Sequence, residues 1–181
     1  MIFPTTFNRN LGVICSVSLG SLGSDFISIT GFSLASEGSA VYPSANLALY
    51  VPFYMQVPGV VTQMFTANGS TAGNNVDVGI YSADGTRLVS SGSTAQSGTS
   101  VEQIYNITDT LLGPGVFYMA VAMDGTTGTL RRVTPGAAPI MTMLGMAQQA
   151  TAFALPAVAT MATCTTNYLP LFGLLFERTA I

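Results

Sequence analysis

The chain has 181 residues, of which five are arginine and eight are acidic, and it contains neither lysine nor histidine. Without these residues a Ser-His-Asp triad, a Cys-His pair, a Schiff-base lysine and a histidine metal site are all excluded. The net charge of −3 and the single adjacent basic pair, Arg131-Arg132, leave no basic face for nucleic acid or for an anionic membrane surface.

Residues 1–41 are rich in Gly and Ser, and we predict that they form an N-terminal arm. Short apolar stretches at residues 13–19 and 26–29 predict two strands within the arm. The apolar run after Arg9 is short and broken by Ser, which does not fit a secretory signal peptide.

Residues 46–57 alternate strictly between two kinds of side chain, which predicts a β-strand. One predicted face holds Leu47, Leu49, Val51, Phe53, Met55 and Val57. The other predicted face holds Ala48, Tyr50, Pro52, Tyr54 and Gln56. Because proline has no N–H to donate, Pro52 should lie at a sheet edge or at a bulge.

Further strands are predicted at residues 60–66, 76–81, 87–90, 101–108, 116–123 and 129–133, separated by turn residues. The Asp84-Gly85 pair predicts a hairpin between two of them. Asp124-Gly125 repeats the same DGT motif, and we predict a second hairpin turn there. This spacing of about 8–12 residues is typical of a β-sandwich or jelly roll.

The C-terminal part is less regular. Residues 140–149 predict either a short helix or a loop packed on the sandwich, and residues 168–176 predict a buried strand before Glu177 and Arg178. This last strand should lie beside a strand of the N-terminal part or in a neighbouring subunit. We therefore predict an all-β protein, an antiparallel jelly-roll-like sandwich (residues 42–133) between an N-terminal arm (1–41) and a C-terminal extension (134–181).

Two long segments carry no charged side chain: 39 residues at 38–76 and 44 residues at 133–176. A monomer in water normally uses charge to keep its surface and strand edges from associating. Residues 137–162 contain two prolines and two glutamines and no run of about 18 apolar residues, so we expect no membrane span. The uncharged segments instead predict contact with other subunits.

Candidate chemistry is sparse. Among the eight acidic residues, Asp77 and Glu102 fall in predicted strands and are the better candidates for a pair of catalytic carboxylates, but a solvated strand face is the favoured explanation for both. Asn74, Asn75 and Asp77 gather oxygen ligands after a loop, but the 12-residue calcium-loop pattern is absent, which favours ordinary loop hydrogen bonds. We expect no enzymatic activity, no metal and no cofactor.

Cysteine and tyrosine leave alternatives open. Cys15 and Cys164 form either one disulfide joining the two ends or two buried thiols. Tyr50 and Tyr54 share a predicted strand face, where they either pack in a core or interface or form a stacking platform for a sugar.

Three stretches resemble a β-sandwich module of small virion proteins of tailed bacteriophages. They are the alternating strand at 46–57, the hairpin "NVDVGIYSADGTRLVSSGS" and the following "LLGPGVFYMAVAMD". The resemblance covers about residues 42–123. It implies a capsid decoration (cement) protein or a tail or fibre component, and it implies no catalytic residues.

The sequence thus predicts a non-enzymatic protein of the virion, located on the capsid surface or, alternatively, in the tail. The expected partners are the major capsid protein and copies of the chain itself, in a homotrimer; in the tail alternative the partner is a host glycan. The residues predicted to contact other subunits are Tyr50, Tyr54, Arg131, Arg132, Leu171, Phe172 and Leu174.

Overall fold

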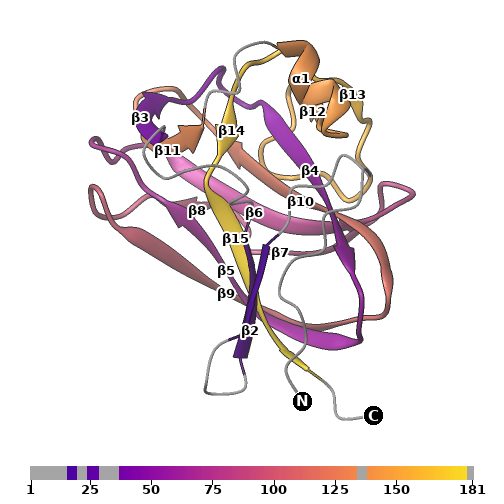
Figure 1. The fold of residues 1–181 in the computed structure, drawn as a ribbon. Helices are drawn as coiled ribbons and strands as arrows, with labels where there is room; N and C mark the ends of the chain where they lie inside the picture. Colours follow the sequence, from indigo (N-terminus) through magenta and orange to yellow (C-terminus); the bar gives the residue numbers. More distant parts are fainter. Residues whose placement is uncertain (1–15, 20–23, 29–36, 134–137, 179–181) are drawn as a thin grey trace.

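The computed structural model describes residues 16–19, 24–28, 37–133 and 138–178 (Figure 1). The strands are β1 (Ser16–Leu19), β2 (Ser24–Ser28), β3 (Glu37–Val41), β4 (Ala48–Met55), β5 (Gly59–Ala67), β6 (Asn75–Ser82), β7 (Arg87–Ser90), β8 (Thr94–Ala95), β9 (Glu102–Leu112), β10 (Gly115–Met123), β11 (Thr129–Val133), β12 (Ala147–Gln149), β13 (Ala162–Thr163), β14 (Leu169–Pro170) and β15 (Phe172–Arg178). Within the described ranges, the one α-helix is α1 (Ala138–Met143).

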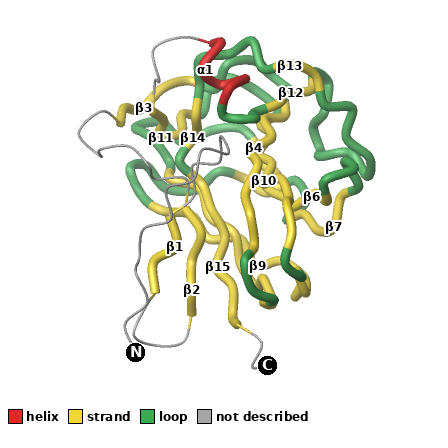
Figure 2. Tube along the Cα trace, turned by 45° about the vertical axis from the view of Figure 1, so that its right-hand side comes forward, coloured by secondary structure: helices red, strands yellow, loops and turns green. Residues whose placement is uncertain are grey.

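Two antiparallel sheets face each other and form a sandwich (Figures 1 and 2). The five-stranded sheet has the order β1-β2-β15-β5-β9. The seven-stranded sheet has the order β13-β12-β4-β10-β6-β7, with β8 paired to β6. A third sheet, β14-β11-β3, continues from one end of the sandwich, where a bridge joins Asn68 to Leu130. The predicted all-β, antiparallel sandwich is confirmed.

The core between the sheets comes from the alternation seen in the sequence. Leu49, Val51, Phe53 and Met55 of β4 pack in one buried cluster with residues of β5, β9 and β15, such as Met64. Burial of such side chains contributes roughly 1.5–3 kcal/mol each and is the main driving force for the fold.

Pro52 has a strand partner on one side only, as the sequence predicts. It lies opposite Tyr118 of β10, whereas β12 pairs only with Ala48, Leu49 and Tyr50 of β4. Gly145 packs closely against the proline ring, because a Cβ on this glycine would lie 3.0 Å from the Pro52 Cγ. The missing N–H of Pro52 therefore interrupts no ladder on its open side.

The two DGT motifs have different outcomes. Asp84-Gly85 joins the paired strands β6 and β7 as a hairpin, with Gly85 at a φ of 87°. The hairpin predicted at Asp124-Gly125 is wrong, because β10 belongs to the seven-stranded sheet and β11 to the three-stranded one. Here Asp124 accepts a hydrogen bond from the backbone N–H of Asn75 (2.8 Å) and turns the chain toward a different sheet.

The C-terminal part is built into the sandwich. β15 lies between β2 and β5, so the last strand joins an N-terminal strand within the same chain, which is the first of the two placements predicted. Residues 140–149 contain the last part of helix α1 and all of strand β12. No described helix has the length and hydropathy that crossing a bilayer requires.

Leu174 of β15 tests this arrangement. Its side chain is fully buried in the main core, so Leu174→Ala should lower the free energy of unfolding by about 2–5 kcal/mol. Leu88→Ala, at a site that is 41% exposed, is the matched control and should change it by less than about 1 kcal/mol. Urea denaturation of both variants measures the difference, and equal losses would contradict a central position for β15.

Candidate interaction surfaces

The described residues contain no group of three or more His, Cys, Asp or Glu side chains placed to hold a metal. The two carboxylates singled out in the sequence lie in different sheets. Asp77 is buried in β6, and Glu102 is exposed at the start of β9, the edge strand of the five-stranded sheet. They therefore do not make the close pair that glycoside hydrolysis requires.

The oxygen-rich loop residues also have structural partners. The side-chain oxygen of Asn74 accepts the backbone N–H groups of Thr127 (2.8 Å) and Gly128 (3.0 Å). Asn75 donates its side-chain amide to Asp124 (2.7 Å), while Asp77 faces another element. The three residues therefore do not converge on one point, in agreement with the loop interpretation.

The outer face of the seven-stranded sheet is covered by an irregular segment, residues 150–161, which we call the strap. Its Ala152 and Leu155 are buried against the outer side of the sheet. Gly79 of β6 makes room for Leu155, because a Cβ there would lie 3.0 Å from the leucine Cδ1. The sheet residues in this second cluster are Ala48, Tyr50, Tyr81, Ala120 and Ala122.

Two charged side chains hold the backbone of Leu155. Asp77 accepts its N–H (3.0 Å), and the Arg87 guanidinium donates to its carbonyl oxygen. The next carbonyl, that of Pro156, accepts the Tyr81 hydroxyl (2.6 Å). Charge-assisted hydrogen bonds of this kind are roughly twice as strong as neutral ones, so they fix the strap at its centre.

Backbone bonds fix the strap at other points. Ala152 donates to the Asn46 carbonyl (2.7 Å), and Ala159 donates to the Gly85 carbonyl (2.8 Å). Between these points the backbone N–H of Arg87 donates to the carbonyl of Ala157 (2.9 Å). The uncharged segment 133–176 is thus partly explained by contacts within the chain.

Four of the residues predicted to contact other subunits are buried in the chain itself. Tyr50 packs edge-on against Tyr81, with ring centroids 5.2 Å apart, and donates its hydroxyl to Gln149 (3.0 Å). Burial raises the pKa of Tyr50 to about 12, so the hydroxyl remains a donor. Leu171, Phe172 and Leu174 are also buried, so these four side chains pack within the chain itself, and their contact with other subunits stays a prediction.

The other three predicted residues reach the surface. Tyr54 is 47% exposed, and Arg131 and Arg132 of β11 are half-buried. The Arg132 guanidinium lies over the ring of Tyr168, 5.4 Å from its centroid. A role of these residues in contacts between subunits stays a prediction.

Tyr54 lies near one end of the sandwich, beside the connections at residues 56–58 and 113–114. Its neighbour Val116 shares the outer face of the seven-stranded sheet, whereas Leu111 lies on the outer face of the five-stranded sheet, in line with Val60 and Glu177. Val116 lies directly opposite Tyr54, and Leu112 lies opposite Gly59. Leu111 is 65% exposed and Val116 is 46% exposed. Sequence reasoning missed Leu111 and Val116, because exposure cannot be recognised in an apolar strand residue.

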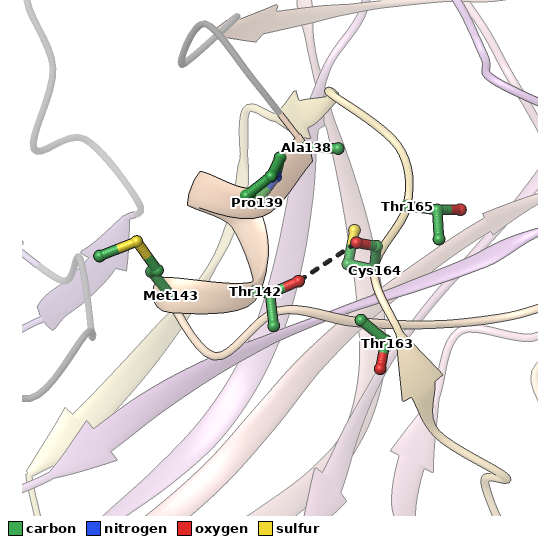
Figure 3. A pocket seen from close by; sticks show the side chains of 7 residues that line it. All are labelled: Ala138, Pro139, Thr142, Met143, Thr163, Cys164 and Thr165. Atoms are coloured by element: carbon green, nitrogen blue, oxygen red, sulfur yellow. Dashed lines mark hydrogen bonds between the residues drawn. The ribbon is translucent and has the colours of Figure 1, made fainter.

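A shallow groove of about 480 Å³ with an uncharged lining lies between α1 and the edge strand β13 (Figure 3). Its lining residues are Ala138, Pro139, Thr142, Met143, Thr163, Cys164 and Thr165. The Thr142 hydroxyl donates to the Cys164 carbonyl (3.3 Å), and Met143 is 79% exposed. Cys164 itself is a free, buried thiol, while Cys15 lies outside the described residues.

Comparison with known proteins adds little to this geometry. No protein-family model matches the chain, and no curated protein sequence does. The VP2 subviral particle of infectious bursal disease virus is similar over 87% of this chain and 37% of its own, with 11% identity and a TM-score of 0.35. The Gx strain of the same virus is similar over 80% and 34%, with 9% identity and a TM-score of 0.32. The chain spans about a third of these structures, and likenesses this distant carry no argument about its function.

The buried carboxylate that holds the strap has a testable pH signature. Burial raises the pKa of Asp77 above its ordinary value of 3.8, against the lowering effect of the Leu155 N–H, Ser91, Arg87 and Ser90. The folded state therefore binds the Asp77 proton more tightly than the unfolded state does. The stability that this proton contributes is fully present below the ordinary pKa of 3.8, and it is lost as the pH rises through the raised pKa of the folded state.

Asp77→Asn keeps an acceptor for the Leu155 N–H but removes the titration. The free energy of unfolding of this variant, relative to the unsubstituted chain, should increase as the pH rises through the interval above 3.8. Denaturant unfolding at a series of pH values measures it, with Asp109→Asn at an exposed position of β9 as the control. A difference that falls with pH would contradict the burial of Asp77 as the dominant effect.

Proposed function

We propose that this chain is a non-enzymatic structural protein of a tailed-phage virion, which binds the capsid surface as a decoration or cement protein. Residues 42–123, which carry the resemblance to phage virion modules, correspond closely to strands β4–β10 of the sandwich. The partners proposed are the major capsid protein and further copies of the chain, in a homotrimer.

The observation that carries the proposal is the pairing of exposed apolar side chains with segments that lack charge. Tyr54, Leu111, Val116 and Met143 are each between 46% and 79% exposed. Each belongs to a sequence segment without a charged residue, at 38–76, 110–123 or 133–176, although Glu177 lies two strands from Leu111 on the same face. Exposed apolar side chains in segments so poor in charge are typical of surfaces that other molecules cover.

Three of the charged side chains also favour a structural role over catalysis. Asp77 and Arg87 bind the strap, and Asp124 accepts backbone and side-chain hydrogen bonds from Asn75. A catalytic acid or base needs to reach a substrate proton, whereas these groups are occupied by the chain itself. The proposal therefore assigns no reaction to the protein.

Capsid binding provides the test. Purified chain added to expanded capsids that lack it should bind saturably, and the decorated capsids should withstand higher temperature than undecorated ones. Capsids of an unrelated phage serve as the control. A virion map should then contain many copies at the capsid symmetry axes. Failure to bind, or a few copies confined to one vertex, would contradict the decoration role.

A tail component that binds a host glycan is the second candidate, favoured by one observation. Tyr54 is 47% exposed, and the half-buried Tyr118 lies diagonally across from it on β10, so two tyrosines neighbour each other on the outer face. Aromatic rings of this kind can pack against the apolar face of a sugar.

A glycan array of host-surface saccharides tests this alternative. If it is correct, the chain binds at least one saccharide, and Tyr54→Ala lowers that affinity by about tenfold or more, equivalent to about 1.4 kcal/mol. Leu88→Ala, on another strand, should leave the affinity unchanged. Absence of any saccharide bound by the intact chain removes the candidate.

A further inference from the structure

The two sheets of the sandwich differ in how their outer faces are covered. The strap packs over the seven-stranded sheet. On the outer face of the five-stranded sheet, Ile104 and Leu111 of β9 are 53% and 65% exposed. Val60 of β5 and Leu175 of β15 lie on the same face and are half-buried. A sheet face with this many apolar side chains is a surface that another segment or molecule covers.

The same face is acidic. Glu177 lies in line with Val60 and Leu111, and Glu102 and Asp109 are exposed on β9. The three arginines whose side chains the structure describes lie in β7 and β11, outside this sheet. A matching cover therefore combines apolar side chains with positive charge and brings no carboxylate of its own.

The N-terminal segment has this composition. Residues 1–15 precede β1 and lie outside the described ranges. Their single charged side chain is Arg9, and no acidic residue occurs before Asp25. The large apolar side chains among them include Ile2, Phe3, Phe7, Leu11, Val13 and Ile14. The segment thus has both the apolar content and the sign of charge that the face requires.

Strand β1 places this segment beside the face. Ser16, the first residue of β1, lies opposite Ser28, and the same row of the sheet continues through Gly173 and Phe65 to Ile104. Because β1 and β9 are the two edges of the sheet, four strand spacings or about 19 Å separate them (Figure 2). Fifteen extended residues span up to about 50 Å, so the segment is long enough to cross the whole face.

Gly173 leaves a path across the middle of the sheet. It is the outward-facing residue of the central strand β15 in this row, since its neighbours Phe172 and Leu174 are buried in the core. A glycine inside a strand often marks a place where another backbone approaches closely. The row from Ser16 to Ile104 therefore has no side chain at its centre that would obstruct a crossing segment.

We propose that residues 1–15 cross the outer face of the five-stranded sheet of their own chain, from Ser16 to Ile104, and continue along β9 to Leu111. Arg9 precedes Ser16 by seven residues, or up to about 23 Å of extended chain, which brings it to β9 beside the acidic Glu102. A segment tethered to the face has a millimolar effective concentration there, which favours it over the same segment of a second copy. The contact does not depend on the capsid role.

Trypsin tests the contact in the full-length chain, because it cuts after arginine and lysine and the chain has no lysine. Arg9 is the only arginine before Arg87, so release of residues 1–9, followed by mass spectrometry, reports on the segment alone. The protease cuts only the undocked population, so the bond after Arg9 should be cleaved about tenfold or more slowly than in a synthetic peptide of residues 1–15. The rate constant should not change with protein concentration.

Substitutions on the face locate the docking site. Ile104→Ser and Leu111→Ser each remove an exposed apolar side chain and should speed the cleavage about threefold or more. Glu102→Gln removes the charge that Arg9 faces and should speed it about twofold, as expected for an exposed ion pair. Leu88→Ser, at an exposed leucine of β7, is the matched control and should leave the rate unchanged. Circular dichroism melting confirms that the variants are folded.

Several results would overturn the inference. Cleavage at the rate of the free peptide means that the segment is undocked. Full protection in Ile104→Ser or in Leu111→Ser places the segment elsewhere, and protection that disappears on dilution assigns the face to the segment of a second copy. An unchanged rate in Glu102→Gln overturns the placement of Arg9. The proposed function fails separately, because a chain with a protected Arg9 that binds no capsid removes only the capsid role.

Discussion

The burial of the outer face of the seven-stranded sheet by the strap is the interaction on which the rest of the structure depends. That face consists of small and aromatic residues such as Ala120, Ala122 and Tyr81, none of which is suited to face water. A sheet that is apolar on both sides needs a cover on both sides. The five-stranded sheet covers one, and the strap covers the other.

The cover depends on hydrogen bonds as well as on apolar area, because an irregular segment has no ladder of its own. Asp77 accepts the backbone N–H of Leu155, and Arg87 donates to its carbonyl oxygen. The Tyr81 hydroxyl donates to the next carbonyl, that of Pro156. Two of the few charged side chains, Asp77 and Arg87, therefore form hydrogen bonds inside the fold. That use deepens the shortage of charge at the surface.

The local pattern of residues predicted where the strands lie, but it predicted poorly which strands and segments pack beside them. The alternation at 46–57 placed Leu49, Val51 and Phe53 on the core face, and the Asp84-Gly85 pair marked a real hairpin. The same turn motif at Asp124-Gly125 was misleading, since a turn fixes the direction of the chain over a few residues and not the sheet that it enters next. The burial of Tyr50 within the chain could not be predicted. The strap that covers it lies about 100 positions later in the sequence and has no periodic pattern.

By itself the sequence determined the fold class, the main strands and the shortage of charge, because side-chain periodicity, turn residues and composition are local properties. A hint of the strap was present as well, in the lack of polar residues at Ala48, Tyr50 and Pro52 on the supposed outer face. Only the tertiary structure decided which apolar residues are covered and which remain exposed. Leu174 and Leu111 are both leucines in strands, yet one is fully buried and the other is 65% exposed. Exposure is set by what packs over a residue from distant parts of the chain, and that information is not local.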